Sequence, residues 1–234
     1  MALLMQPHAM DAKLQEFDKT LKRYLSPKGI KSIELHALRL KTRELYSLLA
    51  SEESFAKEVK KILKYSNSLR DMDVFEEVYL ASLPKKYRTR LPMEQIQARL
   101  EEEREADREA LESYLASFRM PQKVSFALEK KREDAVLPKL PEYEKKELHR
   151  YRIAVKKMLA QEKNREGGNK EKIVYLTQLK DILGTMNDNA NALVRLKRYL
   201  GKTKLFMRLK RRGAKENKKL YKKLKKLTQG KNDA

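Results

Sequence analysis

Apolar residues recur every three or four positions along most of the chain, which is the spacing of one face of an α-helix. In the first segment Leu14, Phe17, Leu21 and Leu25 follow this spacing, and the Ser-Pro-Lys-Gly sequence after them predicts a helix end. No alternating pattern long enough to predict a β-strand occurs, so the expected fold class is all-α. The same periodicity predicts further helices over about 30–50, 55–65, 69–83, 121–134, 142–163, 171–183 and 185–200.

Two segments combine the helical pattern with an unusual charge. Residues 92–117 interleave acidic and basic side chains, which predicts a long solvated helix. Residues 201–234 hold 14 basic and two acidic residues, so more than half of the net charge lies there. Leu220, Leu224 and Leu227 give this last segment a helical stripe. Two interpretations stay open for it, namely a basic amphipathic helix and a solvated, partly frayed terminus.

The composition narrows the class of protein. With 41% apolar and 38% charged residues, amphipathic helices are expected rather than disorder. No run approaches 18 apolar residues and no signal-peptide pattern is present, so we expect a soluble, cytoplasmic protein without a membrane span. The absence of cysteine excludes disulfides, thiolate nucleophiles and cysteine-bound metals. With only three histidines, no metal site is expected.

The net charge points to an anionic partner. The chain has 55 basic and 33 acidic residues, a formal net charge of +22. Such an excess favours association with a polyanion. Because there is no tryptophan and aromatic residues make up 7% of the chain, base stacking with a nucleic acid has little support.

Two of the three histidines begin the same pattern of residues. At about 100° per residue, positions 0, +3 and +7 fall within an arc of about 60° on one helix face. Two such occurrences among three histidines indicate an internal repeat. We call the two sets the first and second basic trio: His36, Arg39 and Arg43, and His149, Arg152 and Lys156.

A second signature follows each trio. The sequence LRDMDV occupies residues 69–74, and LGTMND occupies residues 183–188. Asp71 lies 35 residues after His36, and Asp188 lies 39 residues after His149. We place the four additional residues at the Glu-Gly-Gly-Asn sequence of 166–169. The chain therefore has the organisation of a duplicated helical unit.

These four motifs, in this order, resemble those of the CHAD family, the conserved histidine α-helical domains. The resemblance covers about residues 10–200. It implies two pseudo-twofold-related helical bundles, each a four-helix-type unit, enclosing a basic cavity. The first half would span about 10–84, linking helices 85–137, the second half 138–200, and the basic helical tail 201–234. It also implies binding of inorganic polyphosphate and association with polyphosphate granules, without catalysis and without a cofactor.

The resemblance also implies which residues line the cavity. The family often has a second basic residue directly after the +7 position, where this chain has Glu44 in the first half and Lys157 in the second. At offset ten, where another basic residue is common, it has Tyr46 and Leu159. We therefore expect a less charged cavity and a lower affinity. The residues implied to bind polyphosphate are His36, Arg39, Arg43, His149, Arg152, Lys156 and Lys157.

Elementary chemistry explains why such residues suit polyphosphate. Arginine offers planar, bidentate donors to phosphate oxygens, and lysine is a compact point charge. Histidine gains a charge as the pH falls, so we expect stronger binding near pH 5.5 than near pH 8. Asp71, Asp73 and Asp188 are interpreted as helix N-caps or as partners that orient nearby cations. Arg70 stays open between a phosphate contact and an internal ion pair.

Three other functions compete with polyphosphate binding. General nucleic-acid binding through the basic surface and tail is the main alternative. An enzyme of phosphate metabolism would need metal-binding carboxylates, which the trios do not offer. An adaptor for polyphosphate-metabolising enzymes, acting through the charged helix of 92–117, is neither supported nor excluded by the sequence.

Overall fold

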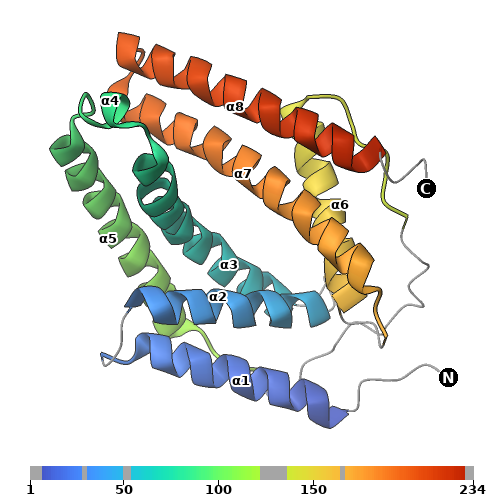
Figure 1. Cartoon of the computed structure of the whole chain (residues 1–234). Helices are drawn as coiled ribbons and strands as arrows, with labels where there is room; N and C mark the ends of the chain where they lie inside the picture. The colour runs from blue at the N-terminus through green and yellow to red at the C-terminus, as the bar shows by residue number, and fades with distance from the viewer. Residues whose placement is uncertain (1–6, 28–30, 50–53, 122–135, 164–166, 230–234) are drawn as a thin grey trace. The chain divides into compact units, whose positions relative to one another are not determined.

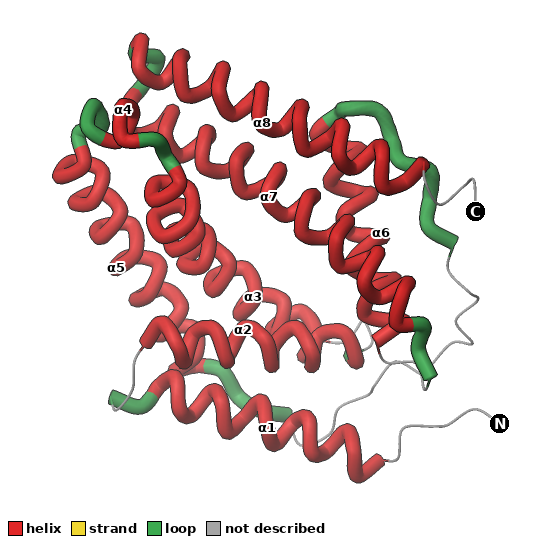
Figure 2. Tube along the Cα trace, in the orientation of Figure 1, coloured by secondary structure: helices red, strands yellow, loops and turns green. Residues whose placement is uncertain are grey.

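The computed structural model describes residues 7–27, 31–49, 54–121, 136–163 and 167–229. In these ranges the regular elements are eight α-helices and one π-helical stretch, with loops between them and no strand (Figures 1 and 2). The all-α prediction is therefore confirmed. The helix predicted over 121–134 lies outside the described residues. Within the described ranges no helix is long and apolar enough to cross a membrane.

The chain divides into two compact units. Unit 1 comprises residues 1–73 and 94–132, and unit 2 comprises residues 74–93 and 133–234. Each unit thus takes two separate stretches of the chain. This division follows contacts between residues and differs from the expected halves at 10–84 and 138–200, whose relation by duplication stays a prediction.

Unit 1 contains four long helices. They are α1 (Pro7–Leu25), α2 (Lys31–Leu48), α3 (Ser54–Asp73) and α5 (Met93–Ser117). Helices α1 and α2 lie side by side, and α2 also packs on α3 (Figure 1). The ring of Phe118, just after α5, packs against two other rings. Its centroid lies 6.0 Å from that of Phe17 and 5.9 Å from that of Phe55. These aromatic contacts close the core of unit 1 at the end of α5.

The charged helix α5 is a packed element rather than a wholly solvated one. Its buried residues are Ile96, Leu100, Leu111 and Leu115. They recur at helical spacing, so one face of α5 packs into unit 1 and the charged side chains occupy the rest of its surface. The Tyr114 hydroxyl also donates to the Glu58 carboxylate of α3.

Unit 2 is built on the longest helix, α7 (Lys170–Leu200), which packs against α6 (Lys145–Lys163) and α8 (Lys204–Gln229) (Figure 1). The π-helical stretch η1 (Val74–Leu80) packs on α7. The ring centroids of Phe75 in η1 and Tyr199 in α7 are 6.0 Å apart. The short helix α4 (Lys85–Arg88) completes the unit. Side chains from α6, α7 and α8 share one apolar core.

Two predicted helix breaks are wrong. The break predicted between Tyr65 and Leu69 is absent, since α3 runs continuously from Ser54 to Asp73. The break predicted at Gly184 is also absent, because α7 runs through it. In both places buried residues continue at helical spacing, and this packing outweighs the weak helix propensity of serine, asparagine and glycine.

The C-terminal segment forms an ordered helix. Helix α8 begins at Lys204 and ends at Gln229, and Leu224 is buried against the core of α6 and α7. Of the two interpretations left open by the sequence, the amphipathic helix is confirmed for these residues. Helix α6 begins at Lys145, three residues later than predicted.

Candidate anion-binding residues

The first basic trio lies on α2, at the border of the helix face that packs into unit 1. Thr42 and several leucines form that buried face. His36 and Arg43 are exposed. Arg39, between them, keeps only 7% of its accessible surface. The trio therefore combines two solvated side chains with one arginine drawn into the protein.

Asn67 of α3 brings the two arginines of this trio together. Arg39 Nη2 donates to Asn67 Oδ1 at 2.8 Å, and Arg43 Nη2 donates to the same oxygen at 3.4 Å. Arg39 Nε is buried and has no hydrogen-bond partner among the described residues. A buried N–H group without an acceptor is unfavourable, so an anion that reached it through movement of the side chains around it would gain this interaction.

The surroundings of Arg39 disfavour its positive charge. Burial, and then the positive charges of Arg43 and Arg70, lower the pKa of the Arg39 guanidinium to about 10, against the opposing effect of Asp71 and Asp73. Arg39 therefore stays charged at neutral pH in a surrounding that disfavours its charge. Arg70 is half-buried and, among the described residues, forms no ion pair. The structure thus assembles three arginines within one electrostatic environment.

The second basic trio lies on α6 in unit 2. His149 is exposed and Arg152 is half-buried. Arg152 Nε, like Arg39 Nε, is buried and has no hydrogen-bond partner in the part of the chain that the structure describes. The arginine at the same position of each trio therefore has a buried N–H group for which the described residues supply no acceptor.

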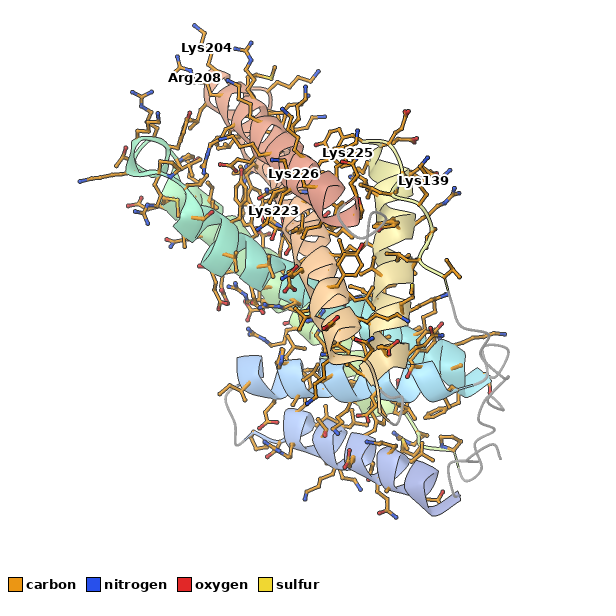
Figure 3. All side chains as sticks on the ribbon, turned by 45° about the vertical axis from the view of Figure 1, so that its right-hand side comes forward. Lys139, Lys204, Arg208, Lys223, Lys225 and Lys226 are labelled. Atoms are coloured by element: carbon orange, nitrogen blue, oxygen red, sulfur yellow. The ribbon has the colours of Figure 1, made fainter. Side chains whose placement is uncertain are left out.

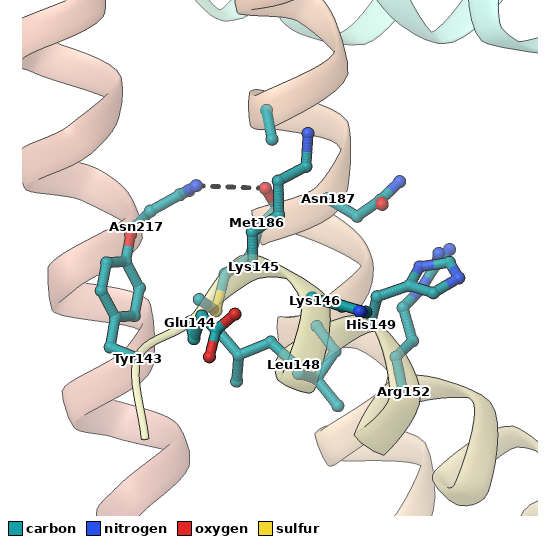
Figure 4. A pocket seen from close by; sticks show the side chains of 12 residues that line it. Tyr143, Glu144, Lys145, Lys146, Leu148, His149, Arg152, Met186, Asn187 and Asn217 are labelled. Atoms are coloured by element: carbon teal, nitrogen blue, oxygen red, sulfur yellow. Dashed lines mark hydrogen bonds between the residues drawn. The ribbon is translucent and has the colours of Figure 1, made fainter. Parts of the chain in front are cut away.

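A pocket of about 600 Å³ opens beside the second trio. His149 and Arg152 line it from α6 and extend from that helix in the same direction (Figure 4). Lys156 and Lys157 are exposed and are not among its lining residues. Of the four residues predicted to bind together in unit 2, His149 and Arg152 therefore line the pocket, whereas Lys156 and Lys157 do not. The other lining residues are Tyr143, Glu144, Lys145, Lys146, Leu148, Leu183, Met186, Asn187, Ala190 and Asn217.

Two features of the pocket set its chemistry. Its base is apolar, with Leu183 2% and Met186 6% exposed, whereas cationic side chains border it. Asn217 is already engaged, since its Nδ2 donates to the Met186 carbonyl at 3.1 Å and its Oδ1 accepts from Asn189 at 2.8 Å. The lining residues therefore combine the cationic side chains of Lys145, Lys146 and Arg152 with one carboxylate, that of Glu144, and this excess of positive charge favours an anionic ligand group.

The carboxylates near the trios do not cap helices. Asp71 and Asp73 lie in the last turn of α3, and Asp188 lies in the middle of α7. The N-cap interpretation is therefore wrong. Asp73 lies 3.9 Å from the Arg104 guanidinium, and both Asp71 and Asp73 act electrostatically on Arg39. Asp71 and Asp73 therefore offset part of the positive charge around Arg39.

The sequence reasoning missed Asn67. It lies in the Ser-Asn-Ser sequence of 66–68, which predicted a helix break and so removed Asn67 from α3. Had the helix been extended, Asn67 would have fallen one turn before Arg70 and Asp71, on their face. The helical spacing therefore contained a signal for its position, although none for its contact with α2.

No group of three or more histidine and acidic side chains that could hold a metal ion occurs in the described ranges. The two trios belong to different units, so the prediction that they face each other across one cavity stays a prediction. No family model matches the chain, and neither the curated proteins nor the solved structures contain a match.

Proposed function

We propose that this protein binds inorganic polyphosphate through the cations of the two basic trios, with Arg70 beside the first and Lys157 beside the second. The observation that carries the proposal is the shared state of Arg39 and Arg152. Each occupies the +3 position of its trio, and each has a buried Nε without a hydrogen-bond partner within the described ranges. Binding without a chemical step is proposed, in keeping with the resemblance to the CHAD family.

Phosphate oxygens supply hydrogen-bond acceptors for the N–H groups of these arginines. A guanidinium forms two parallel hydrogen bonds to the oxygens of one phosphate, and charge assistance makes each bond stronger than a neutral one. Near Arg39, an anion would also offset the repulsion among the three arginines, since Arg43 and Arg70 both lower the Arg39 pKa. A ligand with many linked phosphates is favoured over a single phosphate, because it can engage several cations after losing its translational freedom once.

The helices make the cations available before the ligand arrives. Arg39 is held by Asn67 and by burial in unit 1, so little side-chain freedom remains for a ligand to remove. Arg152 is half-buried in unit 2, which also limits the freedom of its side chain. A protein with this activity would gather at polyphosphate granules in the cytoplasm.

The test is a titration of long-chain polyphosphate in about 150 mM salt. The variant Arg39→Gln with Arg43→Gln removes two cations spaced by four residues on α2. Because a hydrogen bond to a charged group contributes about 1.5–3 kcal/mol, we expect affinity to fall at least tenfold. The matched control is Lys60→Gln with Lys64→Gln, which removes two exposed lysines of the same spacing from α3 and should leave affinity nearly unchanged.

A second pair of variants examines unit 2. Arg152→Gln with Lys156→Gln should also weaken polyphosphate binding at least tenfold. Its control is Lys86→Gln with Arg90→Gln, which removes two exposed cations of equal spacing from the segment around α4 in the same unit. Equal losses in the trio variants and their controls would mean that total charge alone binds polyphosphate, and the proposal would be wrong.

A further inference from the structure

Helix α8 is held as a fixed rod against the rest of unit 2. Phe206, Leu209 and Leu224 are buried. A side-chain carbon built on Gly213 would lie 2.8 Å from Leu193 Cδ1, which shows how closely α8 approaches α7. The Tyr221 hydroxyl donates to the Pro141 carbonyl at 2.8 Å. The orientation of α8 about its own axis is therefore set by packing and hydrogen bonds.

This orientation turns one row of cations to the solvent. Eight exposed basic side chains fall within an arc of about 100°, opposite the buried face of α8, when the helix is read at 100° per residue. The first and the last are 22 residues apart, so the row is about 33 Å long. We call this row the basic stripe; it consists of Lys204, Arg208, Arg211, Lys215, Lys218, Lys219, Lys222 and Lys226.

The basic stripe is not neutralised by nearby acids. Glu216 is the sole acidic residue of α8, and it pairs with the half-buried Arg212 at 2.7 Å, away from the stripe. Within the described residues none of the eight cations forms an ion pair. Figure 3 shows Lys204 and Arg208 near one end of α8 and Lys226 near the other. The protein therefore holds eight like charges in a row whose mutual repulsion only an external anion relieves.

The composition of the stripe indicates what kind of anion it suits. Six of the eight residues are lysines, which act as point charges on phosphates rather than as bidentate readers of bases. No aromatic side chain belongs to the stripe, so the stacking used by single-strand binders is missing from it. The apolar face of α8 is buried against α7, so the helix cannot insert that face into a bilayer.

We propose that the basic stripe binds the phosphate backbone of double-helical nucleic acid without reading its sequence. A duplex carries one negative charge per about 1.7 Å of its axis and releases more counterions per neutralised phosphate than a single strand does. A rigid row of cations about 33 Å long gains most from this dense array of charge. The stripe is separate from the trios, so this inference does not rest on polyphosphate binding.

The test uses the full chain and a duplex of 20 base pairs or so. The variant Lys215→Gln, Lys218→Gln and Lys222→Gln removes three stripe cations at positions 0, +3 and +7. The control Lys57→Gln, Lys60→Gln and Lys64→Gln removes three exposed lysines of identical spacing from α3, which form no ion pair with any described residue. Affinity is measured at several salt concentrations.

We expect the stripe variant to lose at least tenfold in duplex affinity at low salt, whereas the control keeps it. The slope of log K against log salt should become shallower by about 0.9 for each phosphate that the variant no longer neutralises, or about 2.7 for three. Replacing the same three lysines by arginine should preserve binding, because the charges remain.

Three outcomes would overturn the inference. One is unchanged duplex affinity in the stripe variant, and another is an equal loss in the α3 control. The third comes from a parallel titration with vesicles that contain phosphatidylserine: the stripe variant loses vesicle binding but keeps its duplex affinity. The trio variants keep the entire stripe, so they should bind the duplex as the unaltered protein does. Failure of polyphosphate binding and failure of duplex binding are thus told apart.

Discussion

The positive charge of Arg39 is unfavourable for folding, whereas the proposed binding of polyphosphate needs it. Its burial and its arginine neighbours lower the pKa of its guanidinium to about 10. Since the unfolded chain would hold the same proton more tightly, the charge of Arg39 destabilises the folded state at neutral pH. This electrostatic cost is fully present below about pH 10 and falls as the pH rises above that value.

Removing this charge should therefore stabilise the protein. Arg39→Met keeps much of the buried chain length and leaves Arg43 as a donor to Asn67. We expect the free energy of unfolding to rise by about 1–3 kcal/mol at pH 7, as measured by urea denaturation. The gain should shrink in the presence of polyphosphate, which binds the chain that retains Arg39 more tightly and so stabilises it more than the variant.

The control for this prediction is Arg99→Met, which removes an exposed arginine from α5 in the same unit. Its effect should stay within about 0.5 kcal/mol. A lower stability for Arg39→Met than for Arg99→Met would show that hydrogen bonding to Asn67 outweighs the electrostatic cost.

At the scale of single helices, α7 carries a weakness that its packing tolerates. Gly184 lies inside α7, and a side-chain carbon built there would meet nothing within 4 Å. Glycine lowers helix stability by about 0.5–1 kcal/mol relative to alanine in such a position. Gly184→Ala should therefore raise the melting temperature by a few degrees, which calorimetry or circular dichroism can follow.

Gly213 of α8 is expected to behave in the opposite way. It is buried, and a side-chain carbon there would approach Leu193 Cδ1 to 2.8 Å. Gly213→Leu should cost about 1–3 kcal/mol of stability, because α8 would have to move away from α7. Similar melting temperatures for this variant and for Gly184→Ala would contradict the close packing of the two helices.

At the scale of the whole molecule, α8 belongs to the core of unit 2. Its buried residues Phe206, Leu209 and Leu224 come from both ends of the helix. Deleting residues 201–234 would expose the faces of α6 and α7 that they cover. We expect the truncated chain to lose more helical circular dichroism than its missing residues account for, and to unfold at a lower urea concentration.

This expected instability decides how binding by the basic trios and binding by the basic stripe can be told apart. Truncation would confound the removal of the basic stripe with the unfolding of unit 2, whereas lysine substitutions on the exposed face of α8 leave its packing intact. If the truncated chain retained the full stability of its remaining helices, α8 would be a dispensable addition to unit 2.

The ends of α1 and α7 were predictable from the sequence, whereas the interiors of α3 and α7 were not. Proline and serine after Leu25 marked the end of α1, and Leu200 marked the end of α7 before Gly201, because these signals act on the local backbone. The weak helix formers at 66–68 and at Gly184 were read as breaks in the same way. There, contacts with other helices decided the outcome, and no local signal records them.

The sequence by itself determined the all-α class and the position of each trio on one helix face, since both follow from the helical repeat of 3.6 residues. Only the tertiary structure decided that Arg39 is buried beside Arg43 and Arg70, because this depends on where α3 packs against α2. It likewise decided that α8 is anchored and presents its cations outward, through contacts made with distant parts of the chain.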